Sequence, residues 1–178
     1  MSLRRHPETM ASARGFPRGG SRVLRGAAVL ALLAWSAARA GSGPMPYDAG
    51  ADARAELARA LALGAADRKP VLVVFGANWC EDCRAFDRAL QRPATARLVA
   101  GSFRLVKVDV GQFDRNLDVA ADYGNPIAKG IPAAVLLSPG NEVRYATRAG
   151  ELADARRMGE AAIHRFLEGL AAEGRGKR

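Results

Sequence analysis

The sequence contains few residues that bind metals or haem. It has two cysteines, Cys80 and Cys83, and two histidines, of which only His164 lies beyond residue 40. A structural zinc site needs four ligands, and His164 is too far along the chain to complete one with the cysteines. Haem attachment needs a histidine directly after the second cysteine, and Arg84 stands there instead. We therefore expect no metal and no cofactor, and we expect His164 to be an ordinary helix residue.

The N-terminal region lacks an apolar run long enough to span a bilayer. Its longest run, Gly26–Trp35, is about half of the ~20 residues that a transmembrane helix needs. Basic residues precede this run, and the stretch "ARA" that ends at Ala40 has the form of a signal-peptidase site. We expect residues 1–40 to be a signal peptide cleaved near Ala40, with an uncleaved membrane anchor as the alternative. No cysteine directly follows the run to carry a lipid, so we expect no lipoprotein anchor. The leader therefore predicts a periplasmic or otherwise exported domain in an oxidising compartment.

Positive charge is not concentrated beyond this leader. The formal charge is +9, but residues 1–40 carry seven arginines and one glutamate and account for +6 of it. The remaining +3 is spread along residues 41–178, so we expect no nucleic-acid partner. The chain also lacks the glycine-rich fingerprint of a dinucleotide site. A redox role would therefore need a separate electron donor or acceptor, for which a membrane-embedded carrier is one candidate. We also expect the protein to be a monomer.

Hydrophobic patterns predict an α/β domain at 52–172, preceded by a linker at 41–51 and followed by a disordered basic tail at 173–178. The expected elements are, in order, a helix at 52–67, a strand at 71–75, a helix after the cysteines that ends by Pro93, a strand at 103–110, a short helix at 116–123, strands at 133–137 and 142–147 that form a hairpin, and a helix at 153–170.

The two cysteines lie within the stretch "VLVVFGANWCEDCRAF", between a buried strand and a helix. Residues three apart share a helix face, so the two sulfurs can bond. Cys80 would lie at the helix N-terminus, where free N–H groups and the helix dipole stabilise a thiolate, the attacking species in disulfide exchange. Cys83, one turn further on, would then resolve the mixed disulfide. A purely structural disulfide is the alternative, although so short a loop restrains little chain entropy.

Four pieces of sequence resemble the thioredoxin superfamily: "WCEDC", "KVDV", "KGIPAAVLL" and "PGNEV", in that order. The resemblance covers about 53–170 and is greatest to secreted or periplasmic thioredoxin-like disulfide reductases. It implies a thioredoxin fold, with a mixed central sheet of about four strands flanked by helices and an N-terminal helix. It also implies a cis Ile131-Pro132 bond and substrate contacts by Trp79, Ile131 and Pro132. The alternatives are a trans proline that starts a strand and a Trp79 that only packs.

The chain departs from this family pattern near the cysteines. Val74 stands where family members often have a buried acid that accepts the proton of the resolving thiol, and Glu81-Asp82 stands where Gly-Pro is common. A carboxylate ~6 Å from a thiolate disfavours it by ~0.7 kcal/mol in water and by ~3 kcal/mol at an effective dielectric of 20. The helix dipole favours it by ~0.3–1 kcal/mol. Exposed side chains in the first helical turn should lie nearer the lower figure, so the two effects are of similar size. We expect Glu81 and Asp82 to tune the redox balance away from that of a strong oxidant, and the alternative is that these first-turn acids only stabilise the helix.

The sequence therefore predicts a thiol:disulfide oxidoreductase that acts on protein substrates through Cys80 and Cys83, in the reducing or interchange direction. Such an activity would serve cell redox homeostasis. Two alternatives remain open. One is a thioredoxin-fold binding or assembly module with a static disulfide, and the other is a reductase dedicated to one pathway, such as cytochrome c or copper-centre assembly.

Overall fold

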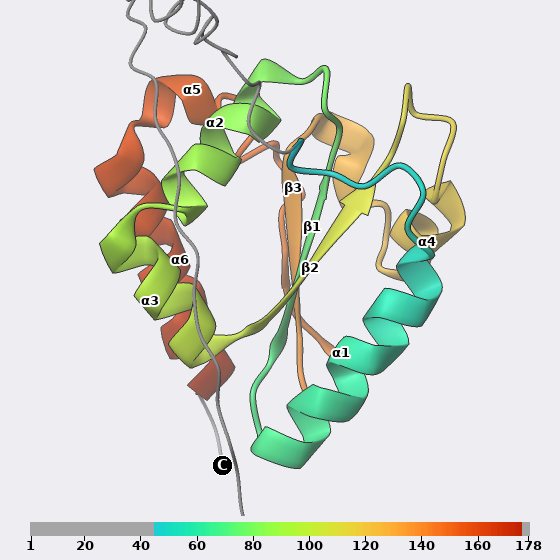
Figure 1. Cartoon of the computed structure of the whole chain (residues 1–178), viewed down its shortest axis with the longest axis vertical. Helices are drawn as coiled ribbons and strands as arrows, with labels where there is room; N and C mark the ends of the chain where they lie inside the picture. Colours follow the sequence, from blue (N-terminus) through green and yellow to red (C-terminus); the bar gives the residue numbers. More distant parts are fainter. Residues whose placement is uncertain (1–44, 176–178) are drawn as a thin grey trace, which may run out of the picture. The chain divides into compact units, whose positions relative to one another are not determined.

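The computed structural model describes residues 45–175 (Figure 1). The expected signal peptide at 1–40 and the last residues of the expected tail, 176–178, lie outside the described residues. None of the helices within 45–175 combines the length and the apolar character needed to cross a bilayer. The elements are α1 (Ala53–Asp67), β1 (Val71–Gly76), α2 (Glu81–Leu90), α3 (Pro93–Ser102), β2 (Arg104–Asp109), α4 (Leu117–Asp122), the 3-10 helix η1 (Pro126–Lys129), β3 (Ala133–Leu137), β4 (Val143–Ala146), α5 (Ala155–Met158) and α6 (Glu160–Arg175).

The four strands form one mixed sheet in the order β2-β1-β3-β4. Strand β1 pairs parallel with β2 and antiparallel with β3, and β3 forms the expected hairpin with β4. Every residue of β1 is buried, because the strand has a neighbour on each side and helices on both faces. The apolar run at 71–75 is therefore the central strand that its composition predicted.

Helices cover the two faces of the sheet in separate layers, with α1 and α4 on one face and α2, α3, α5 and α6 on the other (Figure 1). Alternate residues of β1 point to different layers, as the strand repeat requires. Val73 and Phe75 pack with α1 and α4, whereas Leu72 and Val74 pack with α2, α3 and α6. Val74 thus belongs to an apolar cluster, and an ionised acid at this position would have to be buried there.

The sequence prediction missed the helix α3. It placed a helix end at Pro93, whereas Pro93 is the start of a second helix. Proline is favourable at the first helical position, because its missing N–H would have no partner there and its φ angle already suits the helix. The ten residues of α3 then lead directly into β2.

The prediction of one continuous helix at 153–170 was wrong, because this region forms two helices, α5 and α6. Gly159 separates the two helices at a φ of +76°, a left-handed value that a helix does not contain. Helix α6 then continues to Arg175, which lies within the segment expected to be a disordered tail.

Residues 45–51, within the segment expected to be a linker, contribute a buried side chain to the domain. Tyr47 is 2% exposed, and a Cβ added to Gly76 would lie 2.2 Å from its hydroxyl oxygen. The Tyr47 N–H donates to Asn78 Oδ1 at 3.0 Å, and Asn78 Nδ2 donates to the Tyr47 carbonyl at 2.7 Å. These contacts attach the N-terminal segment to the turn that precedes Cys80.

The buried Tyr47 phenol predicts a loss of stability at alkaline pH. Burial raises the pKa of Tyr47, and the nearby carboxylates of Asp87 and Asp109 raise it further. Because the folded pKa lies above the unfolded one, the stabilisation is complete below about pH 10 and is lost above it by up to ~1.4 kcal/mol per pH unit. Tyr47→Phe should lack this loss. Urea unfolding of both proteins between about pH 8 and 11 checks it, and equal alkaline losses would contradict the expectation.

Candidate active site

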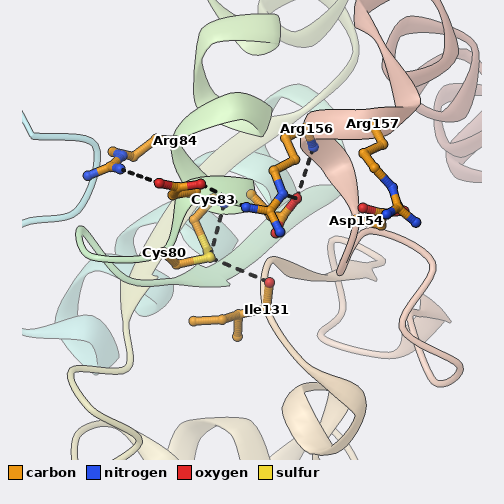
Figure 2. Close-up of polar contacts among 9 residues, drawn as sticks. Cys80, Cys83, Arg84, Ile131, Asp154, Arg156 and Arg157 are labelled. Carbon is orange, nitrogen blue, oxygen red and sulfur yellow. Dashed lines mark hydrogen bonds and ion pairs between the residues drawn. A yellow bond between two sulfur atoms is a disulfide. The ribbon is translucent and has the colours of Figure 1, made fainter.

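The two cysteines form a disulfide at the start of α2 (Figure 2). Their Cα atoms lie 5.2 Å apart, and Cys80 is the N-cap residue of the helix. Cys80 Sγ accepts a hydrogen bond from the Cys83 N–H at 3.1 Å. Cys80 is 6% exposed and Cys83 is 0% exposed. Cys80 therefore lies at the helix N-terminus, as predicted, and Cys83 is the more buried of the two.

The turn between β1 and Cys80 is fixed by hydrogen bonds from three directions. The Cys80 N–H donates to the Ala77 carbonyl at 3.2 Å, which closes the turn itself. Arg84 Nη1 donates to the Asn78 carbonyl at 3.3 Å from within α2. The Asn78 side chain is paired with the backbone of Tyr47, as described above. The position of Cys80 is therefore set by β1, α2 and the N-terminal segment together.

The loop that contains Pro132 approaches the disulfide from β3. The Ile131-Pro132 bond is cis, as the resemblance implied. The Ile131 carbonyl oxygen lies 3.5 Å from Cys80 Sγ (Figure 2). Both Ile131 and Pro132 are buried, so this loop presents mainly backbone at the disulfide.

A hollow of about 380 Å³ lies beside Cys80. It is lined by Trp79, Cys80, Glu81, Asp82, Phe113, Gly130, Ile131, Ala153 and Arg156. Cys83 does not line it, so a molecule in the hollow meets the sulfur of Cys80 first. The hollow brings together every residue that the sequence analysis named for the site except Cys83 and Pro132.

An exposed aromatic pair forms one rim of this hollow. Trp79 is 47% exposed, and its Nε1–H donates to the Gly111 carbonyl at 2.7 Å. Its ring meets Phe113 edge-on, with the ring centroids 6.1 Å apart. Phe113 is itself 41% exposed and has a φ of +61°, which is uncommon for a residue other than glycine. The two rings therefore offer apolar surface to solvent beside Cys80.

Arg156 of α5 contacts both carboxylates between the cysteines (Figure 2). Its Nη1 lies 2.7 Å from Glu81 Oε2, its Nε lies 3.6 Å from Asp82 Oδ1, and its backbone N–H donates to Asp82 Oδ1 at 3.0 Å. Arg84 Nη2 lies 3.9 Å from Glu81 on the other side. Two cations thus face two anions. The two carboxylates are therefore paired, and they oppose the helix dipole less than expected for unpaired charges.

A second ion pair lies one helical turn after Cys83. Asp87 is 5% exposed, forms an ion pair with Lys107 of β2, and accepts a hydrogen bond from Gln91 Nε2 at 2.6 Å. The pair faces a separate hollow of about 820 Å³ along the edge strand β2, which neither cysteine lines. We assign Asp87 and Lys107 to the stability of the domain.

The metal-binding residue types are dispersed in the part of the chain that the structure describes. Within residues 45–175, no three or more histidine, cysteine or acidic side chains are grouped so as to hold a metal ion. His164 lies on α6, where its Nδ1 is 3.0 Å from Thr95 Oγ1 and its Nε2 is 3.6 Å from Glu168 Oε1. It packs between helices, away from the cysteines.

Sequence reasoning missed Arg156, Phe113 and Tyr47. Arg156 reaches the site from 74 residues beyond Asp82, inside a segment predicted to be one uninterrupted helix. Phe113 had a local signal, because it is the one large apolar residue in the polar loop "GQFDRN". Tyr47 stands in a Gly- and Pro-rich stretch whose composition indicates a linker, and only its long-range contacts reveal its role.

Comparisons with known proteins agree with this geometry. A family described as Thioredoxin-like matches residues 52–139. The crystal structure of a disulphide isomerase from Xylella fastidiosa Temecula1 matches with 48% identity and a TM-score of 0.70, over 71% of this chain and 96% of that chain. The solution structure of a thioredoxin from Thermus thermophilus matches with 23% identity and a TM-score of 0.50, over 66% of this chain and 85% of that one. No match was found among curated proteins.

Proposed function

The chain belongs to the thioredoxin superfamily, and from this premise we propose that it is a thiol:disulfide oxidoreductase that exchanges disulfides with protein substrates in the reducing or interchange direction. Its four-stranded mixed sheet, flanking helices and N-terminal α1 form the thioredoxin fold. The observation that carries the proposal is the Cys80–Cys83 disulfide at the start of α2, where Cys80 lines an open hollow and Cys83 is covered. The 48% identity to a protein described as a disulphide isomerase supports the interchange direction.

The proposed reaction starts from the reduced pair. The Cys80 thiolate attacks one sulfur of a substrate disulfide, which forms a Cys80–substrate disulfide and releases the other substrate sulfur as a thiolate. The Cys83 thiolate then attacks the Cys80 sulfur, which closes the Cys80–Cys83 bond and releases the second substrate thiolate. Two electrons pass from the cysteine pair to the substrate. In interchange, a substrate thiolate attacks the substrate sulfur of the mixed disulfide before Cys83 attacks the Cys80 sulfur. This forms a new substrate disulfide and releases the Cys80 thiolate, so the pair ends as it began, in the reduced form.

The second step needs an acceptor for the proton of the Cys83 thiol. Val74 supplies no acid at the position common in the family, and it is buried in an apolar cluster. Glu81 and Asp82 are the acids that line the hollow beside Cys80. We propose that one of these carboxylates, or a water molecule, accepts the proton.

Turnover assays test the proposal directly. With dithiothreitol present as the continuing reductant, the full chain should speed the reduction of insulin above the rate with dithiothreitol alone. Reduced beforehand and freed of dithiothreitol, it should restore activity to ribonuclease with scrambled disulfides. A stronger effect on insulin would favour reduction, and a stronger effect on ribonuclease would favour interchange. A folded protein that is inactive in both assays would contradict the proposal and favour the static-disulfide alternative.

We propose that Trp79 and Phe113 hold protein substrates at the rim of the hollow, together with the backbone at Ile131 and Pro132. Trp79→Ala and Phe113→Ala should each raise KM for insulin about tenfold, because truncating an exposed aromatic anchor costs ~1–2 kcal/mol of binding. Reduction of the small hydroxyethyl disulfide should change less than about twofold, since it does not reach the rim.

Leu63→Ala is the matched control for the aromatic rim. Leu63 is 46% exposed, like Trp79, but it lies on α1 and lines the other hollow. Its removal should leave KM for insulin unchanged. An equal KM for the Trp79, Phe113 and Leu63 variants would contradict the proposed binding surface.

The compartment and the redox partner are also proposals. We propose that the domain works in the periplasm or another exported location, which the pattern of the leader supports. A separate protein would then exchange electrons with Cys80 and Cys83, because the chain lacks a dinucleotide fingerprint. Fractionation of cells that express the full chain tests the location, and a shortened protein that begins after Ala40 is the expected exported form.

A further inference from the structure

We propose that Arg156 is a positioning residue that shifts the equilibrium between the dithiol and disulfide forms of Cys80 and Cys83. The inference rests on the proposed function and deepens it, because it assigns the redox balance of this site to a residue outside the cysteine loop. Arg156 contacts Glu81 at 2.7 Å and Asp82 at 3.6 Å, and it lines the same hollow as Cys80.

Helix α5 is attached to the start of α2, so the Arg156 charge has a defined place. The Arg156 N–H donates to Asp82 Oδ1, and the Asp82 side chain is only 14% exposed. Ala155, the preceding residue, is buried in the same apolar cluster as Phe86 of α2. The guanidinium group is therefore held at the rim of the hollow both by its own contacts and by its helix.

The position of this charge matters in the reduced state. A Cys80 thiolate at the helix N-terminus is stabilised by the helix dipole and opposed by the charges of Glu81 and Asp82. Arg156 lowers the summed charge of the three side chains from −2 to −1, which removes part of that opposition. Stabilising the thiolate stabilises the reduced pair. The more stable the reduced pair is, the stronger an oxidant the Cys80–Cys83 disulfide becomes. Without Arg156, the disulfide form should gain relative to the dithiol.

Arg157, the next residue on α5, provides a matched control. Its side chain is 79% exposed, and its Nε lies 2.8 Å from Asp154 Oδ2. Figure 2 shows Arg156 pointing towards the cysteines, whereas Arg157 points to Asp154 on the side away from them. Arg156→Met and Arg157→Met therefore remove the same charge from the same helix, but only Arg156→Met removes it from beside Glu81 and Asp82.

The test equilibrates the full chain and its variants with glutathione at low ionic strength. In this reaction, the dithiol and oxidised glutathione give the protein disulfide and two molecules of reduced glutathione. Arg156→Met should shift the equilibrium about five- to tenfold towards the protein disulfide, or about 20–30 mV for this two-electron couple. Arg157→Met and the charge-conserving Arg156→Lys should stay within about twofold of the original protein, because both leave a cation beside the carboxylates.

Two further readouts separate an electrostatic role from a structural one. In Arg156→Met, the pH at which Cys80 alkylation reaches half its maximal rate should rise. In the Glu81→Gln/Asp82→Asn double variant, both this pH and the glutathione equilibrium should move in the opposite direction. Equal equilibria for Arg156→Met and Arg157→Met would overturn the inference while leaving the proposed function standing. A folded original protein that does not equilibrate with glutathione would overturn both.

Discussion

Replacing Cys80 with serine is expected to reduce the rate of insulin reduction to the uncatalysed level. A serine hydroxyl cannot form the mixed disulfide through which exchange proceeds. Cys83→Ser should keep the first attack, because of the two cysteines only Cys80 lines the hollow. The reaction should then stop at the mixed disulfide with one substrate molecule. Initial rates measured with each protein reduced beforehand by dithiothreitol give the comparison.

The two serine variants control for one another. Each loses the same Cys80–Cys83 disulfide, so any loss of stability from the missing bond is shared. The variants should differ only in which sulfur remains available to the substrate. Steady turnover by Cys80→Ser, or covalent capture of substrate by both variants to the same extent, would contradict the roles assigned to the two cysteines.

Lys107→Met is expected to lower the free energy of unfolding by about 2–4 kcal/mol. Removing one partner of a buried ion pair leaves the other charge buried alone, at a cost of about 3–5 kcal/mol when both are fully buried. The Asp87 side chain is 7% exposed but that of Lys107 is 28% exposed, which places the expected loss towards the lower end. Urea denaturation at neutral pH measures this difference.

Arg144→Met gives the matched comparison on the strand at the opposite edge of the sheet. Arg144 and Glu142 also form an ion pair, but their side chains are 42% and 72% exposed. Its removal should cost less than about 1 kcal/mol, as is usual for exposed pairs. The Asp87→Asn/Lys107→Met double variant should recover part of the loss of Lys107→Met, since no charge is left unpaired. Equal losses for Lys107→Met and Arg144→Met would contradict the structural role of the buried pair.

Elements with a strong local pattern were predicted well from the sequence. The β-branched run of β1, the cysteine spacing at the start of α2 and the turn between β3 and β4 are each determined by neighbouring residues. The cis bond at Pro132 came from the family resemblance, because no local pattern distinguishes it from a trans bond. Together these features were enough to place the two sulfurs at the end of the central strand.

The electrostatics of the site could not be predicted in the same way. The sequence shows Glu81 and Asp82 between the cysteines, but it does not show that Arg156 lies against both of them. Arg156 lies on α5, which Gly159 separates from α6, and this glycine was a local signal against a continuous helix. A residue that reaches a site from a distant helix leaves no mark in the spacing around the site.

Capture of a substrate by Cys83→Ser tests most directly whether the cysteines exchange disulfides with proteins. The reduced variant is mixed with insulin, and the products are separated without reductant and identified by intact mass and peptide mapping. We expect one mixed disulfide on Cys80, released by dithiothreitol and absent from Cys80→Ser. A folded Cys83→Ser protein that forms no such adduct, while its Cys80 thiol is shown to be reduced, would contradict the proposed function.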